Sequence, residues 1–140
     1  MSWIIYQMIR LKKLPSPAKK RELIIQALYQ KEISGCSNTE VFKQFKQNHK
    51  SIDLQEFEDI LKAIKRDNLK IDAEIINFSK VELSEITEIE LSILRLAIFE
   101  LKENTLDKAI VINEGIRLAK KFGQDSSHKF VNAVLDKIVV

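Results

Sequence analysis

Residues 109–140 read AIVINEGIRLAKKFGQDSSHKFVNAVLDKIVV and predict two amphipathic helices joined by a short turn. Apolar residues in each half recur at the spacing that places them on one face of a helix, and charged residues fall on the other face. Gly123 can turn left-handed at a helix end, and polar residues that can cap a new helix follow it closely. The predicted apolar faces are Ile112, Gly115, Ile116, Ala119 and Phe122 in the first helix and Phe130, Val131, Val134, Leu135 and Ile138 in the second, with Asp125, Ser126 and Ser127 as caps between them.

Five further helices are predicted upstream. Ser16 followed by Pro17 is a strong helix start, because proline already has a helical φ angle and its missing N–H would be unpaired in the first turn. Asp53 with Glu56 resembles a capping box at the start of another helix. Residues 84–102 are the most apolar of these segments, which favours a central position in the fold. The upstream helices are predicted over residues 17–34, 39–48, 53–68, 71–78 and 84–102.

Two residues inside predicted helices are unusual for their surroundings. Arg95 lies in the most apolar helix, so we expect it to be partly buried against an acidic or carbonyl partner, in a structural role. Gly115 costs about 1 kcal/mol relative to alanine in a helix interior. A glycine at that position therefore indicates close packing between helices.

Composition indicates one helical globular domain of ordinary size. The chain has 140 residues, of which 45% are hydrophobic and only three are Gly and two Pro, a balance that favours helices over disorder. Its one cysteine, Cys36, cannot form an internal disulfide, which favours a reducing cytoplasm. The apolar residues 3–9 are too few to span a membrane and are followed by positive charge, unlike a signal peptide. Residues 15–140 are interpreted as the domain, and residues 1–14 either as a disordered extension or as sequence upstream of a native start at Met8.

Positive charge is concentrated at both ends of the chain. Residues 1–31 have a net charge of +6, residues 32–107 of −6 and residues 108–140 of +3. Lys19, Lys20 and Arg21 lie in the first turns of a helix, where the helix dipole disfavours each cation by about 0.3–1 kcal/mol. That cost suggests a use, because phosphate oxygens bind both to cations and to the free N–H groups of a helix start.

No arrangement of residues for catalysis or metal binding is recognisable. His49 and His128 are far apart in the sequence and have no matched cluster of cysteines or acids. The acids from Glu82 to Glu90 are better explained by the dipole of a helix start than by a metal site. We therefore predict a binding protein rather than an enzyme, without a cofactor or a metal ion.

Three motifs in order, ILRLAIFEL at residues 93–101, INEGIRLAKKFG at 112–123 and SSHKFVNAVLDKI at 126–138, resemble the C-terminal signature of the NusB family of bacterial transcription antitermination factors. The resemblance extends from about residue 19 and is dense over residues 86–138. It implies an all-α fold of about seven helices in two orthogonally packed bundles. It also implies binding of single-stranded boxA RNA from nascent ribosomal RNA transcripts, jointly with the ribosomal protein NusE and within the antitermination complex of RNA polymerase.

The resemblance implies particular site residues. Single-stranded RNA is held by cations on phosphates and by rings against bases, and Lys129 with Phe130 offers both at a helix start. Phe130 also belongs to the apolar face of its helix, so core packing is an equal alternative. Glu90 is implied as a contact for NusE. The implied RNA surface comprises Lys19, Lys20, Arg21, Gln26, Tyr29, Ser127, Lys129 and Phe130, and we expect residues 19–21 to lie close to residues 127–130.

The sequence departs from the family pattern at its basic start. Pro17 and Ala18 stand where further arginines often occur, which predicts a weaker direct affinity for RNA. Two other functions remain open: a helical adaptor that binds only proteins, and an accessory RNA-binding domain of the ribosomal RNA methyltransferase type. The absence of a catalytic domain within 140 residues argues against the second.

Overall fold

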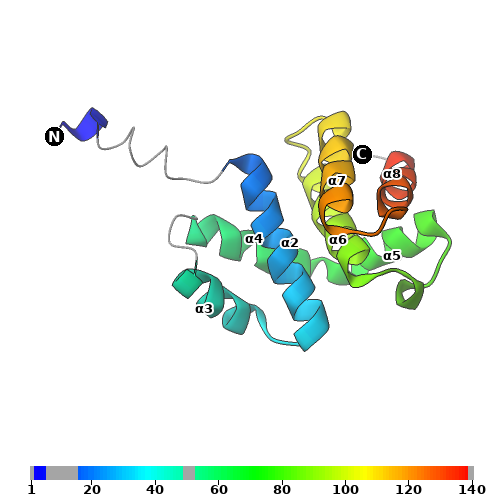
Figure 1. Cartoon of the computed structure of the whole chain (residues 1–140), viewed down its shortest axis with the longest axis horizontal. Coiled ribbons are helices and arrows are strands. Elements are labelled where there is room, and N and C mark those ends of the chain that lie inside the picture. The colour runs from blue at the N-terminus through cyan, green and yellow to red at the C-terminus, as the bar shows by residue number, and fades with distance from the viewer. Residues whose placement is uncertain (1, 6–15, 49–52, 139–140) are drawn as a thin grey trace.

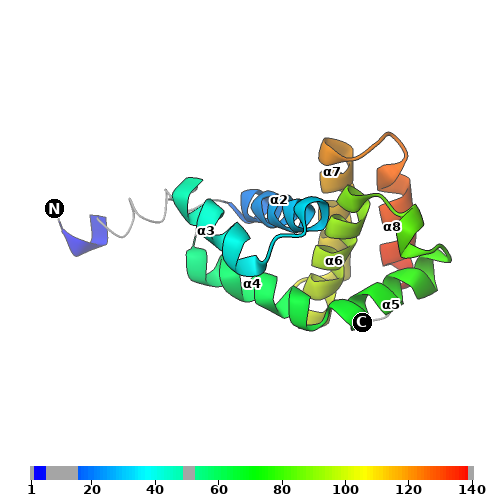
Figure 2. The same cartoon turned by 90° about the horizontal axis from the view of Figure 1, so that it is seen from below.

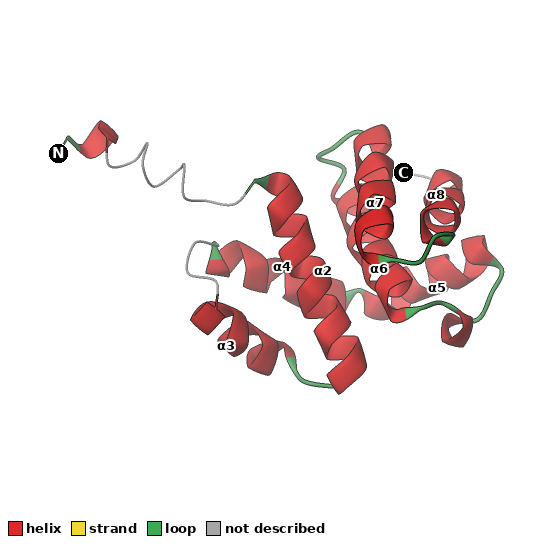
Figure 3. Cartoon of the chain, viewed as in Figure 1, coloured by secondary structure: helices red, strands yellow, loops and turns green. Residues whose placement is uncertain are grey.

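The computed structural model describes residues 2–5, 16–48 and 53–138, and within these ranges every regular element is helical (Figures 1 and 3). The predicted all-α fold of about seven helices is confirmed. Met8, His49 and most of the predicted N-terminal extension lie outside the described residues. The helices are α2 (Pro17–Ser34), α3 (Asn38–Asn48), α4 (Leu54–Arg66), α5 (Asn68–Ser79), α6 (Glu88–Glu103), α7 (Lys108–Phe122) and α8 (Ser127–Lys137), with a 3-10 turn at Leu83–Glu85.

The helices form two groups that meet at α6. Helices α2, α3 and α4 pack on one another, and α5, α7 and α8 surround α6 in the second group. Helix α6 also contacts α2 and α4, so it belongs to both groups (Figure 2). Among the described residues, no helix has both the length and the apolar composition needed to cross a membrane.

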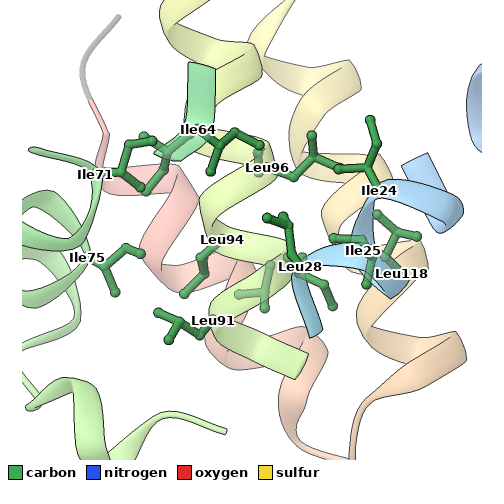
Figure 4. Packing of buried hydrophobic residues seen from close by; sticks show 14 of the residues in the cluster. Ile24, Ile25, Leu28, Ile64, Ile71, Ile75, Leu91, Leu94, Leu96 and Leu118 are labelled. Carbon is green, nitrogen blue, oxygen red and sulfur yellow. The ribbon is translucent and has the colours of Figure 1, made fainter. Parts of the chain in front are cut away.

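Helix α6 supplies the centre of the core, as its apolar sequence predicts. Ile93, Leu94, Ile98 and Leu101 are each at most 1% exposed, and apolar side chains from both groups converge on this helix (Figure 4). Burial of this kind contributes roughly 1.5–3 kcal/mol for each large apolar side chain.

The start of α6 differs from the prediction. The helix begins at Glu88 rather than near residue 84, because Thr87 has extended backbone angles and its side chain accepts a hydrogen bond from the Glu90 N–H at 3.3 Å. The Glu90 carboxylate in turn accepts from the Thr87 N–H at 3.2 Å. This reciprocal pair is a capping box. The Asp53 side chain does accept hydrogen bonds from two N–H groups at the start of α4. Among the interactions of the described residues, however, the Glu56 carboxylate accepts none from the Asp53 N–H, as a full capping box would require.

The turn between α7 and α8 corrects the predicted role of Gly123. Its φ is −93° and its ψ −171°, which is extended backbone rather than a left-handed cap. Glycine is needed there for space, since a Cβ atom would lie 2.7 Å from both the Ala119 carbonyl oxygen and the Ser127 Cβ. At Gly115 the predicted close packing is confirmed: a Cβ atom would lie 3.0 Å from Leu135 of α8.

Candidate nucleic-acid interface

The start of α2 has the predicted cap. The Ser16 hydroxyl accepts a hydrogen bond from the Lys19 N–H at 3.2 Å, and Pro17 occupies the first turn. Lys19 is exposed, and Lys20 forms a 2.8 Å ion pair with Glu56 of α4 in which both side chains are at least one-third exposed. Such an exposed pair contributes about 0–1 kcal/mol, so a phosphate can compete for Lys20.

Arg21 does not have the open position that the sequence suggested. Its side chain is only 12% exposed, and its Nε and Nη2 atoms donate to the Glu100 carboxylate at 3.0 and 2.9 Å. Its Nη1 atom lies 3.6 Å from Glu114 of α7. The hydrogen bonds to Glu100 raise the pKa of Arg21 against the effect of burial. Arg21 is therefore held between α6 and α7, and its guanidinium group is already occupied.

Two further predicted residues on α2 point outward. Gln26 is exposed, and Tyr29 is 39% exposed. They lie about one and two turns beyond Glu22 on α2. Their exposure leaves an amide and an aromatic ring available to a ligand.

The start of α8 contains one predicted residue that the structure assigns differently. Ser127 is fully buried, and its hydroxyl accepts a hydrogen bond from the Gln124 N–H at 3.0 Å. It therefore stabilises the turn and presents no surface to RNA. Ser126, at the cap position, makes no side-chain cap. Lys129 is exposed, whereas Phe130 is half-buried and packs against the core with part of its ring still accessible.

Helix α7 lies between the two predicted basic segments (Figures 1 and 2). Arg117 donates from Nη2 to the Ala18 carbonyl at 3.3 Å, and Lys121 forms an ion pair with Glu22. Residues 19–21 and 127–130, which we expect to lie close together, are connected in the structure through α7, which contacts both α2 and α8. The exposed Lys120 at this end is a further outward cation that the sequence analysis did not assign.

Comparisons with known proteins show the family to which the chain belongs. A model of the NusB family matches residues 18–140. The chain belongs to the NusB family. It is 40% identical over 129 residues to the transcription antitermination protein NusB of Colwellia psychrerythraea, a match that covers 89% of this chain and 94% of the relative. It is 38% identical over 123 residues to the transcription antitermination protein NusB of Yersinia pestis, a match that covers 86% of this chain and 89% of the relative.

Solved structures of similar proteins have the same fold as this NusB family member. T. maritima NusB matches with a TM-score of 0.77 and 25% identity, over 89% of this chain and 90% of that one. A chain from a crystal structure described as that of a plectonemic RNA supercoil matches with a TM-score of 0.74 and 26% identity, over 86% and 93%.

Glu90 of this NusB family member is largely buried, with 8% of its surface exposed. Its carboxylate closes the capping box at the start of α6. A change to lysine would remove this cap. The contact with NusE stays a prediction, and it must be tested with a side chain that keeps the hydrogen bond.

Within residues 2–5, 16–48 and 53–138, no cluster of three or more His, Cys, Asp or Glu side chains is suited to holding a metal ion. Glu88 and Glu90 lie in the first turn of α6, where the helix dipole favours negative charge.

Proposed function

We propose that this chain is a transcription antitermination factor that binds boxA RNA of nascent ribosomal RNA transcripts together with NusE. The observation that carries the proposal is the 40% identity, across nearly the whole chain, to a curated transcription antitermination protein. The exposed cations on α2, α7 and α8 support it, because phosphate contacts dominate the affinity of proteins for nucleic acid.

The proposed RNA surface follows the order α2, α7, α8. Lys19, Lys120 and Lys129 are exposed cations that would neutralise phosphates, one from each helix. Lys20 would join them when a phosphate displaces its exposed partner Glu56. Tyr29 and the accessible part of Phe130 would stack on bases, which is sequence-tolerant and contributes about 1–3 kcal/mol per base. Arg21 and Ser127 would support this surface without contacting RNA. Arg21 holds α2 against α6 and α7, and Ser127 stabilises the turn before α8.

Replacing Lys19 and Lys20 with alanine is expected to weaken binding to all single-stranded RNAs similarly. It should also reduce the slope of log affinity against log salt concentration by about 0.7 for each lost phosphate contact, or about 1.4 for two. Titration of boxA RNA and of an unrelated single strand at several salt concentrations measures both effects. The matched control replaces Lys43 and Lys46, exposed residues of α3, with alanine. An equal loss in the control would mean that only net charge matters.

An electrophoretic shift with boxA RNA, with and without NusE, separates the proposed function from a helical adaptor that binds only proteins. The proposed factor should bind the RNA more tightly with NusE than without it. An adaptor would bind protein partners and leave the RNA unshifted in both lanes.

Glu90→Gln is expected to weaken NusE binding by about 0.2–1 kcal/mol, because it removes one interface charge. The amide oxygen of glutamine can still accept from the Thr87 N–H, since a capping box accepts either residue, so the melting temperature should hold. Calorimetric titration with NusE measures the effect, with Glu58→Gln on α4 as the control. An affinity equal to that of the unaltered chain would remove Glu90 from the interface.

A further inference from the structure

Glu22 is an acidic residue among the cations of the proposed RNA surface, which include Lys19, Lys120 and Lys129. Its side chain is only 8% exposed and forms an ion pair with Lys121 of α7. Arg117 and Lys19 also act on it electrostatically. The hydrogen bond from Lys121 lowers the pKa of Glu22 against the effect of burial, so its carboxylate is ionised at neutral pH. A polyanion binding here would be repelled by this charge unless the surrounding cations neutralised it.

The pair between Glu22 and Lys121 is one of three polar bridges that join α2 to α7. Arg117 reaches the Ala18 carbonyl, and Arg21 reaches Glu114. Beneath these bridges, Ile25 of α2 and Leu118 of α7 belong to the same core cluster (Figure 4). Apolar contacts are non-directional and do not by themselves set how α7 lies along α2. The polar bridges therefore fix the position of the end of α7.

We propose that Glu22 is a positioning residue of the RNA face, which holds Lys121 and with it the end of α7 beside the start of α2. This inference rests on the proposed function, because it concerns the surface that would bind RNA. Lys120, which neighbours Lys121, and the turn leading to Lys129 are placed by the same contact. The carboxylate thus contributes to RNA binding although its own charge opposes it.

The role can be tested because it predicts an effect of unusual sign. Simple electrostatics predicts that Glu22→Gln strengthens RNA binding, since it removes a negative charge from the face. The positioning role predicts that Glu22→Gln weakens binding of boxA RNA by about threefold to tenfold, the range expected when one of two coupled groups is removed. Glu40→Gln on α3 removes the same charge at an exposed site away from this face and should leave the affinity unchanged.

Repeating the Glu22→Gln change in a variant that lacks Lys121 tests whether Glu22 acts through Lys121. In a chain carrying Lys121→Met, Glu22→Gln should no longer weaken binding and should instead strengthen it slightly, because the carboxylate then only repels phosphate. RNA titrations are done on samples whose folded fraction is measured by circular dichroism at the same temperature, so that lost stability is not mistaken for lost affinity.

The outcomes distinguish this inference from the proposed function. If the unaltered chain does not bind RNA alone or with NusE, the proposed function fails and the positioning role fails with it. If the unaltered chain binds and Glu22→Gln binds equally or more tightly, only the positioning role is overturned. A weakening that persists unchanged alongside Lys121→Met would also overturn it.

Discussion

Asp72→Ala is expected to lower the free energy of unfolding by about 3–5 kcal/mol, the usual cost of breaking a buried ion pair by removing one of its members. Asp72 accepts hydrogen bonds from Arg95 Nε and Nη2, both at 2.9 Å, and the two side chains are 11% and 12% exposed. Glu32 of α2 accepts from Arg95 Nη1 at 2.8 Å. Arg95 thereby ties α2, α5 and α6 together where the two helical groups meet. Burial alone would lower the pKa of Arg95, but the hydrogen bonds to Asp72 and Glu32 outweigh it and raise the value.

Chemical denaturation of matched variants tests this expectation. Glu32→Ala should cost less than Asp72→Ala, because Glu32 is 37% exposed and water can replace it. Glu58→Ala, which breaks the exposed pair with Lys62, should change stability by no more than about 0.5 kcal/mol. Combining Arg95→Met with Asp72→Leu should recover most of the loss, since an apolar replacement of a buried pair is often neutral. A loss below 1 kcal/mol for Asp72→Ala would mean that Arg95 finds water or another partner.

Local sequence signals predicted most of the helices well. The Ser16–Pro17 start of α2 depends on neighbouring residues only, and it is present in the structure. The partial burial of Arg95 could be predicted because the residues around it, ILRLAIF, are apolar on every face of the helix. The start of α6 lies at Glu88 rather than near residue 84, because the reciprocal hydrogen bonds of Thr87 and Glu90 fix it there.

The site was harder to predict because its side chains depend on distant residues. Arg21 is bound by Glu100, which is 79 residues away in the sequence, so no local pattern distinguishes it from the exposed Lys19. Ser127 is a predicted RNA contact, but it is fully buried and its hydroxyl accepts a hydrogen bond from the Gln124 N–H. The order α2, α7, α8 across the face requires the packing of both helical groups. The family resemblance pointed to these segments without showing which of their side chains are exposed.

Phe130→Ala is expected to weaken RNA binding by about 1–3 kcal/mol with little change in the salt dependence, because stacking on a base involves no counterion release. Phe130 is half-buried and packs against the core, so the same change should also lower stability. The stability loss should be below the roughly 3–5 kcal/mol typical of fully buried phenylalanines. The loss of affinity would come from the exposed part of the Phe130 ring, and the loss of stability from the part that packs against the core.

Phe42→Ala is the matched control for this change. Phe42 of α3 is also partly buried against the core, but it lies in the other helical group. It should lose stability to a similar extent while the folded protein binds boxA RNA with unchanged affinity. Melting curves and RNA titrations on the same samples separate the two effects. If Phe130→Ala behaves like the control, with lower stability and unchanged affinity of the folded fraction, Phe130 is a core residue alone, and Tyr29 is left as the aromatic group that meets the bases.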